Sequence, residues 1–240
     1  PTWKCSPAAP ASAGTIGATN HSEPPTSERR RSGLGSTATD DQQIIFLDFD
    51  GADVSGDVFG TGVDATLSPL SAFLANWGLT PGDEDAVIDG TIDAVVESLD
   101  HDLRVLDGRN GDRDASGTPG EFDVEVLNSR DHGDRWGEPN VTRVVVGGTI
   151  NELQIATLGI AQSIDPGNTE SEETAVVLLD EMSGPVGSEV SINTYGLADG
   201  VTKSEFVGFV VGHITGHEIG HAVGNWRKDA LNEVIAIMDA

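Results

Sequence analysis

Cysteine is almost absent from this 240-residue chain, which has Cys5 alone. A single cysteine excludes an internal disulfide and any metal site built from several cysteines. Basic residues are also scarce: 13 lysines and arginines stand against 40 aspartates and glutamates, so the formal net charge is −27. Because this charge repels phosphate backbones and anionic lipids, we expect neither nucleic acid nor a membrane as partner. The acidic surface fits a secreted or extracellular protein.

Periodic apolar patterns are missing from residues 1–40, which are rich in Pro, Ala, Ser, Thr and Gly. Such a segment cannot bury enough apolar surface to offset its ordering entropy, so we predict a disordered leader or linker there. Residues 41–240 are long enough for one domain with its own core. Their most apolar stretch, Phe206–Val223, contains three histidines and a glutamate, which favours a buried helix over a membrane span.

Five apolar runs predict the strands of one sheet. We expect them at Gln43–Phe49, Phe122–Leu127, Thr142–Val146, Gly159–Ser163 and Ala175–Leu179. Alternation of these runs with helical segments predicts an α/β (α+β) fold, with a twisted mixed five-stranded sheet and two long helices packed against it.

Helix starts are marked by capping residues. Ser68-Pro69 predicts a short helix that ends at Trp77, with serine as N-cap and proline at the first helical position. Thr80-Pro81 predicts the start of a long amphipathic helix, whose apolar positions continue to Leu103.

The last helix is expected to begin at Thr202, which forms a capping box with Glu205, and to end at Gly224. Glycines recur along it at every fourth position, at Gly208, Gly212, Gly216 and Gly220. Because they lie on one face, we expect this helix to approach its neighbours closely.

The same helix contains the pattern H-E-x-x-H in His217, Glu218 and His221. Histidines at positions i and i+4 lie on one helix face, so both imidazoles can bind one Zn²⁺ ion. Glu218 is adjacent and can deprotonate a water molecule there. The alternative is a core helix with two hydrogen-bonded histidines.

With Gly224 and the downstream Met238, this pattern resembles the metzincins, whose motif is H-E-x-x-H-x-x-G-x-x-H followed by a Met-turn. More narrowly, 216–239 resembles bacterial secreted metzincins related to the matrixins, which read HExGHxxGNWHTD and then IMD. The similarity extends from Ile44 to Asp239 and includes LDFDG, EVLNSRDH, VVVGGT, GIAQSID and TAVVLLD.

This resemblance implies a zincin-like five-stranded sheet, an active-site helix, and an edge strand that pairs with the peptide substrate. We therefore expect residues 41–240 to be a metzincin-like catalytic domain, truncated just after the Met-turn. The expected activity is that of a zinc-dependent metalloendopeptidase that cleaves extracellular proteins. We expect a monomer within a larger multidomain secreted protein, and Gly159–Ser163 as the edge strand.

The sequence departs from the family pattern at Arg227, where the third histidine belongs. A guanidinium stays protonated and cannot donate a lone pair to a metal. Three alternatives remain open: Asp229 or water completes the zinc site, the domain is a pseudopeptidase that binds peptides without cleaving them, or position 227 is a sequence error. His213 is a poor third ligand, because it lies about 12 Å from His221 along the helix axis.

Two further acidic patterns suggest other chemistry. Asp48-x-Asp50-Gly51 after an apolar run resembles the nucleophile motif of haloacid-dehalogenase-type phosphatases, although no acidic pair follows the required lysine, Lys203. A second pattern has the ligand spacing of a calcium loop and comprises Asn110, Asp112, Asp114 and Glu121. Because alanine replaces its glycine, the alternative for that loop is a solvated acidic turn rather than a Ca²⁺ site.

Overall fold

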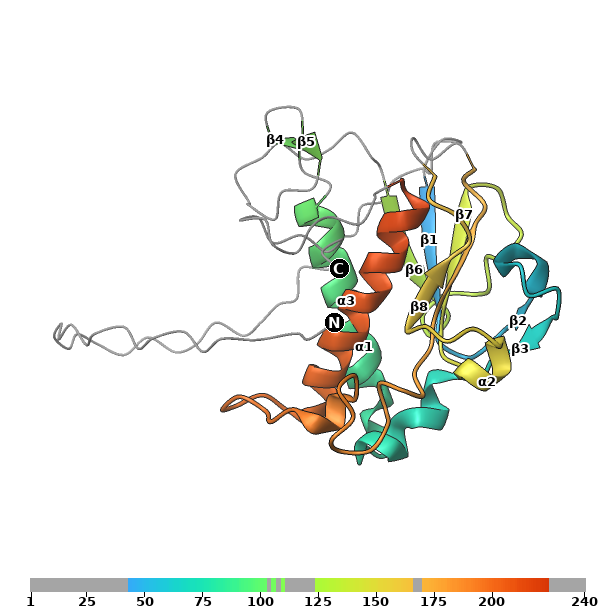
Figure 1. The fold of residues 1–240 in the computed structure, drawn as a ribbon. Helices are drawn as coiled ribbons and strands as arrows, with labels where there is room; N and C mark the ends of the chain where they lie inside the picture. The colour runs from blue at the N-terminus through green and yellow to red at the C-terminus, as the bar shows by residue number, and fades with distance from the viewer. Residues whose placement is uncertain (1–42, 103–104, 107–108, 111–123, 166–169, 225–240) are drawn as a thin grey trace, which may run out of the picture. The chain divides into compact units, whose positions relative to one another are not determined.

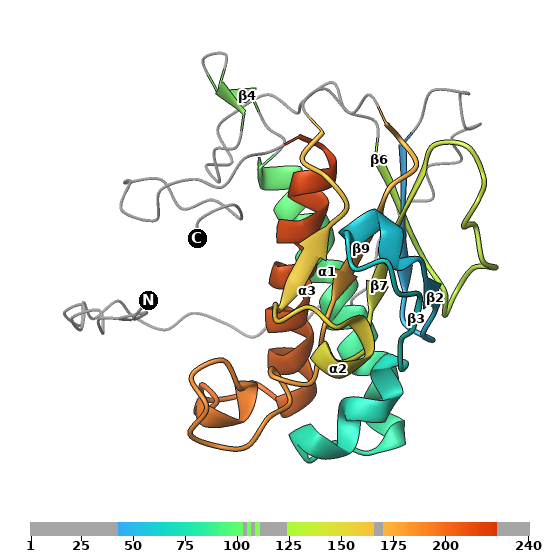
Figure 2. The ribbon, with the colours of Figure 1, turned by 45° about the vertical axis from the view of Figure 1, so that its right-hand side comes forward.

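The computed structural model describes residues 43–102, 105–106, 109–110, 124–165 and 170–224, which belong to one compact unit, Ala38–Ala240. A five-stranded mixed sheet and two long helices form this unit, as Figures 1 and 2 show. The predicted α/β class with a mixed five-stranded sheet is confirmed.

The sheet has the strand order β6-β1-β7-β9-β8. Its members are β1 (Gln43–Asp48), β6 (Val124–Asn128), β7 (Val141–Val146), β8 (Gly159–Ala161) and β9 (Thr174–Val177). Neighbouring strands are parallel except β8, which pairs antiparallel with β9 at the edge. Strands β1, β7 and β9 are buried at every position, as expected for central parallel strands covered on both faces. All five runs were predicted, and their ends shift by one or two residues.

The two long helices, α1 (Glu84–Asp102) and α3 (Lys203–Ala222), pack against each other and cover one face of the sheet (Figure 2). The core between them contains Ile45 and Leu47 from β1, Val95 from α1, and Val211 and Ile219 from α3. This core fixes the position of the helix that carries the H-E-x-x-H pattern.

The predicted capping box at the start of α3 is confirmed. Thr202 accepts a hydrogen bond from the Glu205 backbone N–H at 3.2 Å, and Glu205 accepts one from the Thr202 N–H at 2.7 Å. The helix ends at Ala222, and Gly224 then adopts a left-handed φ of 88°, while its N–H donates to the His221 carbonyl at 2.8 Å. A glycine meets this backbone requirement without steric cost.

The short helix predicted after Ser68 is confirmed and ends at Trp77 as expected, but the predicted roles of Ser68 as N-cap and Pro69 as first helical residue are wrong. The chain forms a 3₁₀ helix, η2 (Leu70–Trp77), in which Pro69 is the N-cap with extended backbone. The Ser68 hydroxyl donates instead to Glu152 at 2.5 Å, so a tertiary contact replaces the cap. The second predicted start is confirmed in modified form, because Thr80 caps a short 3₁₀ turn, η3 (Pro81–Asp83), that leads into α1.

Several short elements were not predicted. They are β2 (Asp53–Val54), η1 (Gly56–Phe59), β3 (Ala65–Thr66), β4 (Val105–Leu106), β5 (Arg109–Asn110), α2 (Ile150–Leu153) and η4 (Ile192–Thr194). Of these, β2, β3 and α2 lie on the side of the sheet opposite α1 and α3, where Val54, Ala65 and Leu153 pack on Val145 and Val176 (Figure 1). These elements are too short for a periodic pattern to reveal them. No helix in the described ranges is both long and apolar enough to span a membrane.

Glycines at the contact between α1 and α3 bring the two helices close together. A Cβ atom on Gly208 would lie 2.7 Å from the Val87 carbonyl oxygen and 2.9 Å from the Gly90 Cα. A Cβ atom on Gly212 would lie 2.6 Å from the Ala94 Cβ. The close approach predicted from the glycine pattern is therefore confirmed at these two positions.

We predict that Gly208→Ala destabilises the protein by about 1–3 kcal/mol, because the added methyl group overpacks a backbone-to-backbone contact. The gain of alanine over glycine in helix propensity, about 1 kcal/mol, offsets only part of this cost. Urea unfolding measures the change. Gly196→Ala is the control, since a Cβ there meets no atom within 4 Å, and equal stability of the two variants would contradict the prediction.

Candidate active site

The last two turns of α3 carry His217, Glu218 and His221. The rings of His217 and His221 lie on one side of the helix, with centroids 4.8 Å apart and planes at 88°. Two imidazoles that each bind one Zn²⁺ through a nitrogen at about 2.0–2.1 Å, with a tetrahedral angle between the bonds, have ring centres about 5 Å apart. The observed separation therefore fits two zinc ligands.

Glu218 lies between the helix and the edge of the sheet. Only 4% of its surface is exposed, and a Cβ atom built on Gly159 of β8 would lie 2.6 Å from its Oε1 atom. The absence of a side chain at position 159 thus makes room for the Glu218 carboxylate. Sequence reasoning missed this role of Gly159, because nothing in the local pattern links a strand glycine to a residue 59 positions later.

A cleft of about 670 Å³ runs along this junction. Glu218 and His221 line one side, and Ile160 and Ala161 of β8 line the other, together with Ile164. The prediction that Gly159–Ser163 forms an antiparallel edge strand is confirmed for Gly159–Ala161. An edge strand beside a cleft can pair with an extended peptide.

The segment after β8 is tied to the end of α3. The Asp165 N–H donates to the His221 carbonyl at 3.3 Å, and the Ser163 hydroxyl donates to Glu173. Glu173 is 1% exposed, and burial raises the pKa of its carboxyl, with Asp165 and Glu170 nearby adding to the effect. Ser163 lines the cleft, so this buried carboxylate supports one of its walls. The sequence carried no signal for it.

Several predicted site residues fall outside the described residues: Arg227, Asp229, Met238, Asp112, Asp114 and Glu121. Asn110 lies at the end of β5. Within the described ranges, no three His, Cys, Asp or Glu side chains converge on a position that could hold a metal ion. The described part of the chain therefore offers two candidate ligands, and a third would come from elsewhere in the chain or from solvent.

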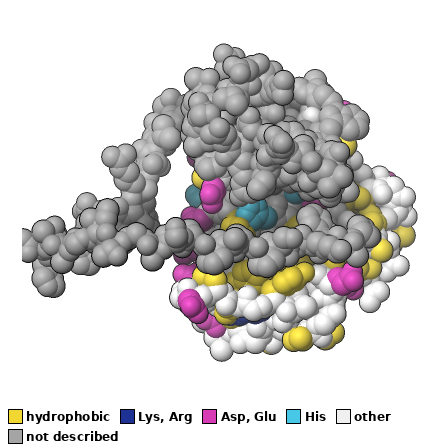
Figure 3. Space-filling model, turned by 60° about the vertical axis from the view of Figure 1, so that its left-hand side comes forward, with side chains coloured by type: hydrophobic (Ala, Val, Ile, Leu, Met, Phe, Trp, Pro, Cys, Tyr) yellow, Lys and Arg dark blue, Asp and Glu magenta, His cyan; other side chains and the backbone are white. Residues whose placement is uncertain are grey.

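Histidine side chains reach the surface on the face drawn in Figure 3, beside hydrophobic side chains. On α3 itself, His213 stacks edge-on against Phe209, with ring centroids 4.3 Å apart. His213 thus has an aromatic partner one turn before the two candidate ligands.

A second polar site occupies the opposite side of the sheet. Asp48 ends β1, is 6% exposed, and lines a pocket of about 430 Å³ with Asp50, Ser129 and Arg143. Burial, followed by its hydrogen bond to the Asp50 carboxyl, raises the pKa of Asp48 to about 7. The same hydrogen bond lowers the pKa of Asp50. The two carboxyl groups therefore share a proton below about pH 7.

This pocket does not favour the phosphatase alternative. A carboxyl that is protonated up to neutral pH is a poor nucleophile. Lys203, the only lysine that could serve a phosphatase motif among the described residues, lines a different cavity, at the start of α3. The basic side chain described beside Asp48 is Arg143, which stacks over Trp136 at 4.6 Å and donates to the Asp53 carbonyl at 3.0 Å.

Asp48 should make stability depend on pH. Its pKa is higher in the folded protein than the ordinary 3.8, so the unfolded chain loses this proton first. The free energy of unfolding should therefore fall as pH rises from about 4 to about 7, and the loss stays constant above that range. Asp48→Asn removes this titration, so the variant should exceed the parent by about 1–3 kcal/mol at pH 8 and match it near pH 4.

Urea unfolding between pH 4 and pH 8 measures this difference. Asp57→Asn, at an exposed aspartate on the same side of the sheet, serves as the control and should follow the parent at every pH. A constant offset between Asp48→Asn and the parent at all pH values would refute the assignment.

Comparisons with known proteins add no relative. No protein-family model matches the chain, and neither a curated protein nor a solved structure is significantly similar to it.

Proposed function

We propose that the protein is a secreted zinc-dependent endopeptidase of the metzincin type, which hydrolyses peptide bonds in extracellular proteins. The observation that carries the proposal is the arrangement at the end of α3. The paired rings of His217 and His221 have the spacing of two ligands of one zinc ion, and Glu218 lies between them and the edge strand.

The arrangement of the sheet supports a zincin-like fold. Four parallel strands end in an antiparallel edge strand, β8, and the helix with the H-E-x-x-H residues packs against β8 and β9. This is the combination that the metzincin resemblance implies: a five-stranded sheet, an active-site helix and an edge strand for substrate. The edge strand and the helix are in direct contact here, because Gly159 of β8 packs on the Glu218 side chain of α3.

Each residue has a definite task in this chemistry. His217 and His221 would hold the zinc ion, which supplies a Lewis acid that polarises the scissile carbonyl. Glu218 accepts a proton from the water molecule that attacks this carbonyl and then donates it to the leaving amine. Its burial beside β8 keeps the carboxylate in one position and excludes bulk water.

Substrate binding would use the free side of β8. An extended peptide there forms backbone hydrogen bonds with the strand, which are independent of its sequence. Ile160 and Ile164 line the cleft and favour apolar substrate side chains. The large negative charge disfavours strongly acidic substrates.

Arg227 favours a second candidate function, a pseudopeptidase that binds peptides at β8 without cleaving them. A guanidinium in place of a third ligand weakens a zinc site by its charge and by the loss of a donor. The two candidates differ in zinc content and in cleavage, and both can be measured.

We predict that the purified protein contains zinc and cleaves unstructured casein, and that Glu218→Gln abolishes cleavage while the zinc content stays nearly unchanged. The variant loses the proton acceptor but no ligand. Atomic absorption and a fluorogenic casein assay measure the two properties. Glu97→Gln, at an exposed position of α1, is the control and should retain both. Zinc-free protein without cleavage would exclude the peptidase and leave the pseudopeptidase.

We also predict that Arg227→His raises zinc affinity by at least an order of magnitude, about 1.4 kcal/mol, because it adds a ligand and removes a positive charge. Competition with a chromogenic zinc chelator measures the affinity. If Asp229 is already a ligand, the gain is small and Asp229→Ala removes the metal. Tight zinc binding that neither substitution alters would overturn the role of both positions.

A further inference from the structure

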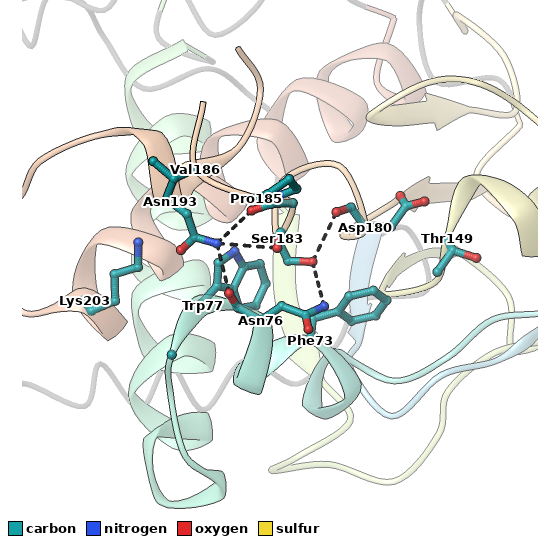
Figure 4. Close-up of a pocket in the computed structure, with 12 residues that line it drawn as sticks. Phe73, Asn76, Trp77, Thr149, Asp180, Ser183, Pro185, Val186, Asn193 and Lys203 are labelled. Atoms are coloured by element: carbon teal, nitrogen blue, oxygen red, sulfur yellow. Dashed lines mark hydrogen bonds between the residues drawn. The ribbon is translucent and has the colours of Figure 1, made fainter. Parts of the chain in front are cut away.

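A cavity of about 790 Å³ lies at the carboxyl ends of the central strands, close to the start of α3. Thr149 follows β7, Asp180 and Ser183 follow β9, Trp77 belongs to η2, and Lys203 is the first residue of α3 (Figure 4). Its size is within the range of small-molecule pockets, about 300–1,000 Å³. Segments far apart in the sequence thus meet at one cavity.

The carboxyl ends of two neighbouring strands, β7 and β9, lie beside this cavity. Strands β7 and β9 are parallel neighbours. The chain leaves β7 toward α2 on one face of the sheet, whereas it leaves β9 toward α3 on the other face (Figure 1). In open α/β sheets, ligands bind in crevices outside the carboxyl ends of the strands. The fold therefore favours this cavity as a binding site.

Lys203 is the only basic side chain among the described residues that line the cavity. No carboxylate of the described residues lies within ion-pair distance of its Nζ atom, which donates only a long hydrogen bond of 3.4 Å to the Ile192 carbonyl. Burial lowers the pKa of this lysine, and no neighbouring carboxylate raises it. An ammonium group that has no ion pair among the described residues is suited to an anionic ligand.

Hydrogen bonds hold the walls of the cavity in place. The Asn193 side-chain amide donates to the carbonyls of Asn76 and Gly184, each at 2.9 Å, and the Trp77 indole donates to the Met182 carbonyl at 3.0 Å. The Asn76 amide donates to the Ser183 hydroxyl at 3.3 Å (Figure 4). A cavity with walls fixed in this way costs a ligand little ordering entropy.

We propose that this cavity binds a small amphipathic carboxylate, with the carboxylate at Lys203 and the apolar part against Phe73 and Trp77. A single negative charge fits better than a phosphate, because Lys203 is the only basic side chain among the described residues of the lining. N-Acylated amino acids and the C-terminal residue of a peptide belong to this class.

The cavity is separate from the candidate zinc site. Lys203 precedes His217 by 14 residues on the same helix, which corresponds to about 21 Å along the axis. Binding there requires neither zinc nor Glu218, so the proposal does not rest on peptidase activity. Its test can be performed on the full chain whether or not the protein cleaves peptides.

The test compares N-acetylphenylalanine with its neutral amide in titrations followed by NMR. We expect the acid, at millimolar concentration, to shift the Trp77 indole and the Asn76 and Asn193 side-chain amide signals saturably. The amide should bind at least tenfold more weakly, because it lacks the charge that pairs with Lys203. Lys203→Gln should bring the two ligands to equal affinity, whereas Lys203→Arg should preserve the preference for the acid.

Arg135→Gln removes one positive charge outside this cavity and should leave the preference unchanged, which controls for net charge. Preserved amide spectra in Lys203→Gln would show that the variant is folded. Equal affinity of the acid and the amide for the parent would overturn the proposal. So would the absence of saturable shifts at these three side chains, or an undiminished preference for the acid in Lys203→Gln.

Discussion

The packing of α3 on α1 is the constraint on which the rest of the structure depends. At Gly208 the two helix backbones approach so closely that a Cβ atom would lie 2.7 Å from the Val87 carbonyl oxygen. This approach leaves α3 in contact with β8 and β9 as well as with α1. Because the helix is rigid, contacts in its first half determine where His217, Glu218 and His221 lie in its second half. The glycines are thus part of the architecture of the site, although they lie outside the cleft.

The edge strand β8 is also needed to position Glu218 of α3. Glu218 would be a partly exposed helix residue without β8, and Gly159 is the position at which that strand admits its carboxylate. The position of β8 at the edge of the sheet also leaves one side of this strand beside the cleft, where a peptide can pair. The position of Glu218 in the H-E-x-x-H pattern of α3 therefore depends on Gly159 of β8.

Three separate polar sites lie around this sheet. The histidines and Glu218 lie toward the end of α3, Lys203 lies at its start, and the Asp48–Asp50 pair lies on the opposite side of the sheet. Burial shifts the pKa at two of these sites. It raises the pKa of Asp48 to about 7 and lowers the pKa of Lys203. Both shifts disfavour the charged form, which is the general effect of removing water from an ionisable group. An acidic chain can thus contain both a protonated carboxyl pair and a partly buried lysine.

The sequence by itself determined the five strands, the two long helices, the capping box at Thr202 and the glycine contacts of α3, because each leaves a periodic or local pattern. It also placed His217, Glu218 and His221 on one helix through their spacing alone. Only the tertiary structure decided that Ser68 binds Glu152 rather than capping a helix, that Gly159 admits Glu218, and that Asp48 and Asp50 share a proton. These features join residues that are distant in sequence or depend on burial, so no local pattern could reveal them. The cavity at Lys203 has the same origin, since its lining comes from five separate segments that meet only when the sheet is assembled.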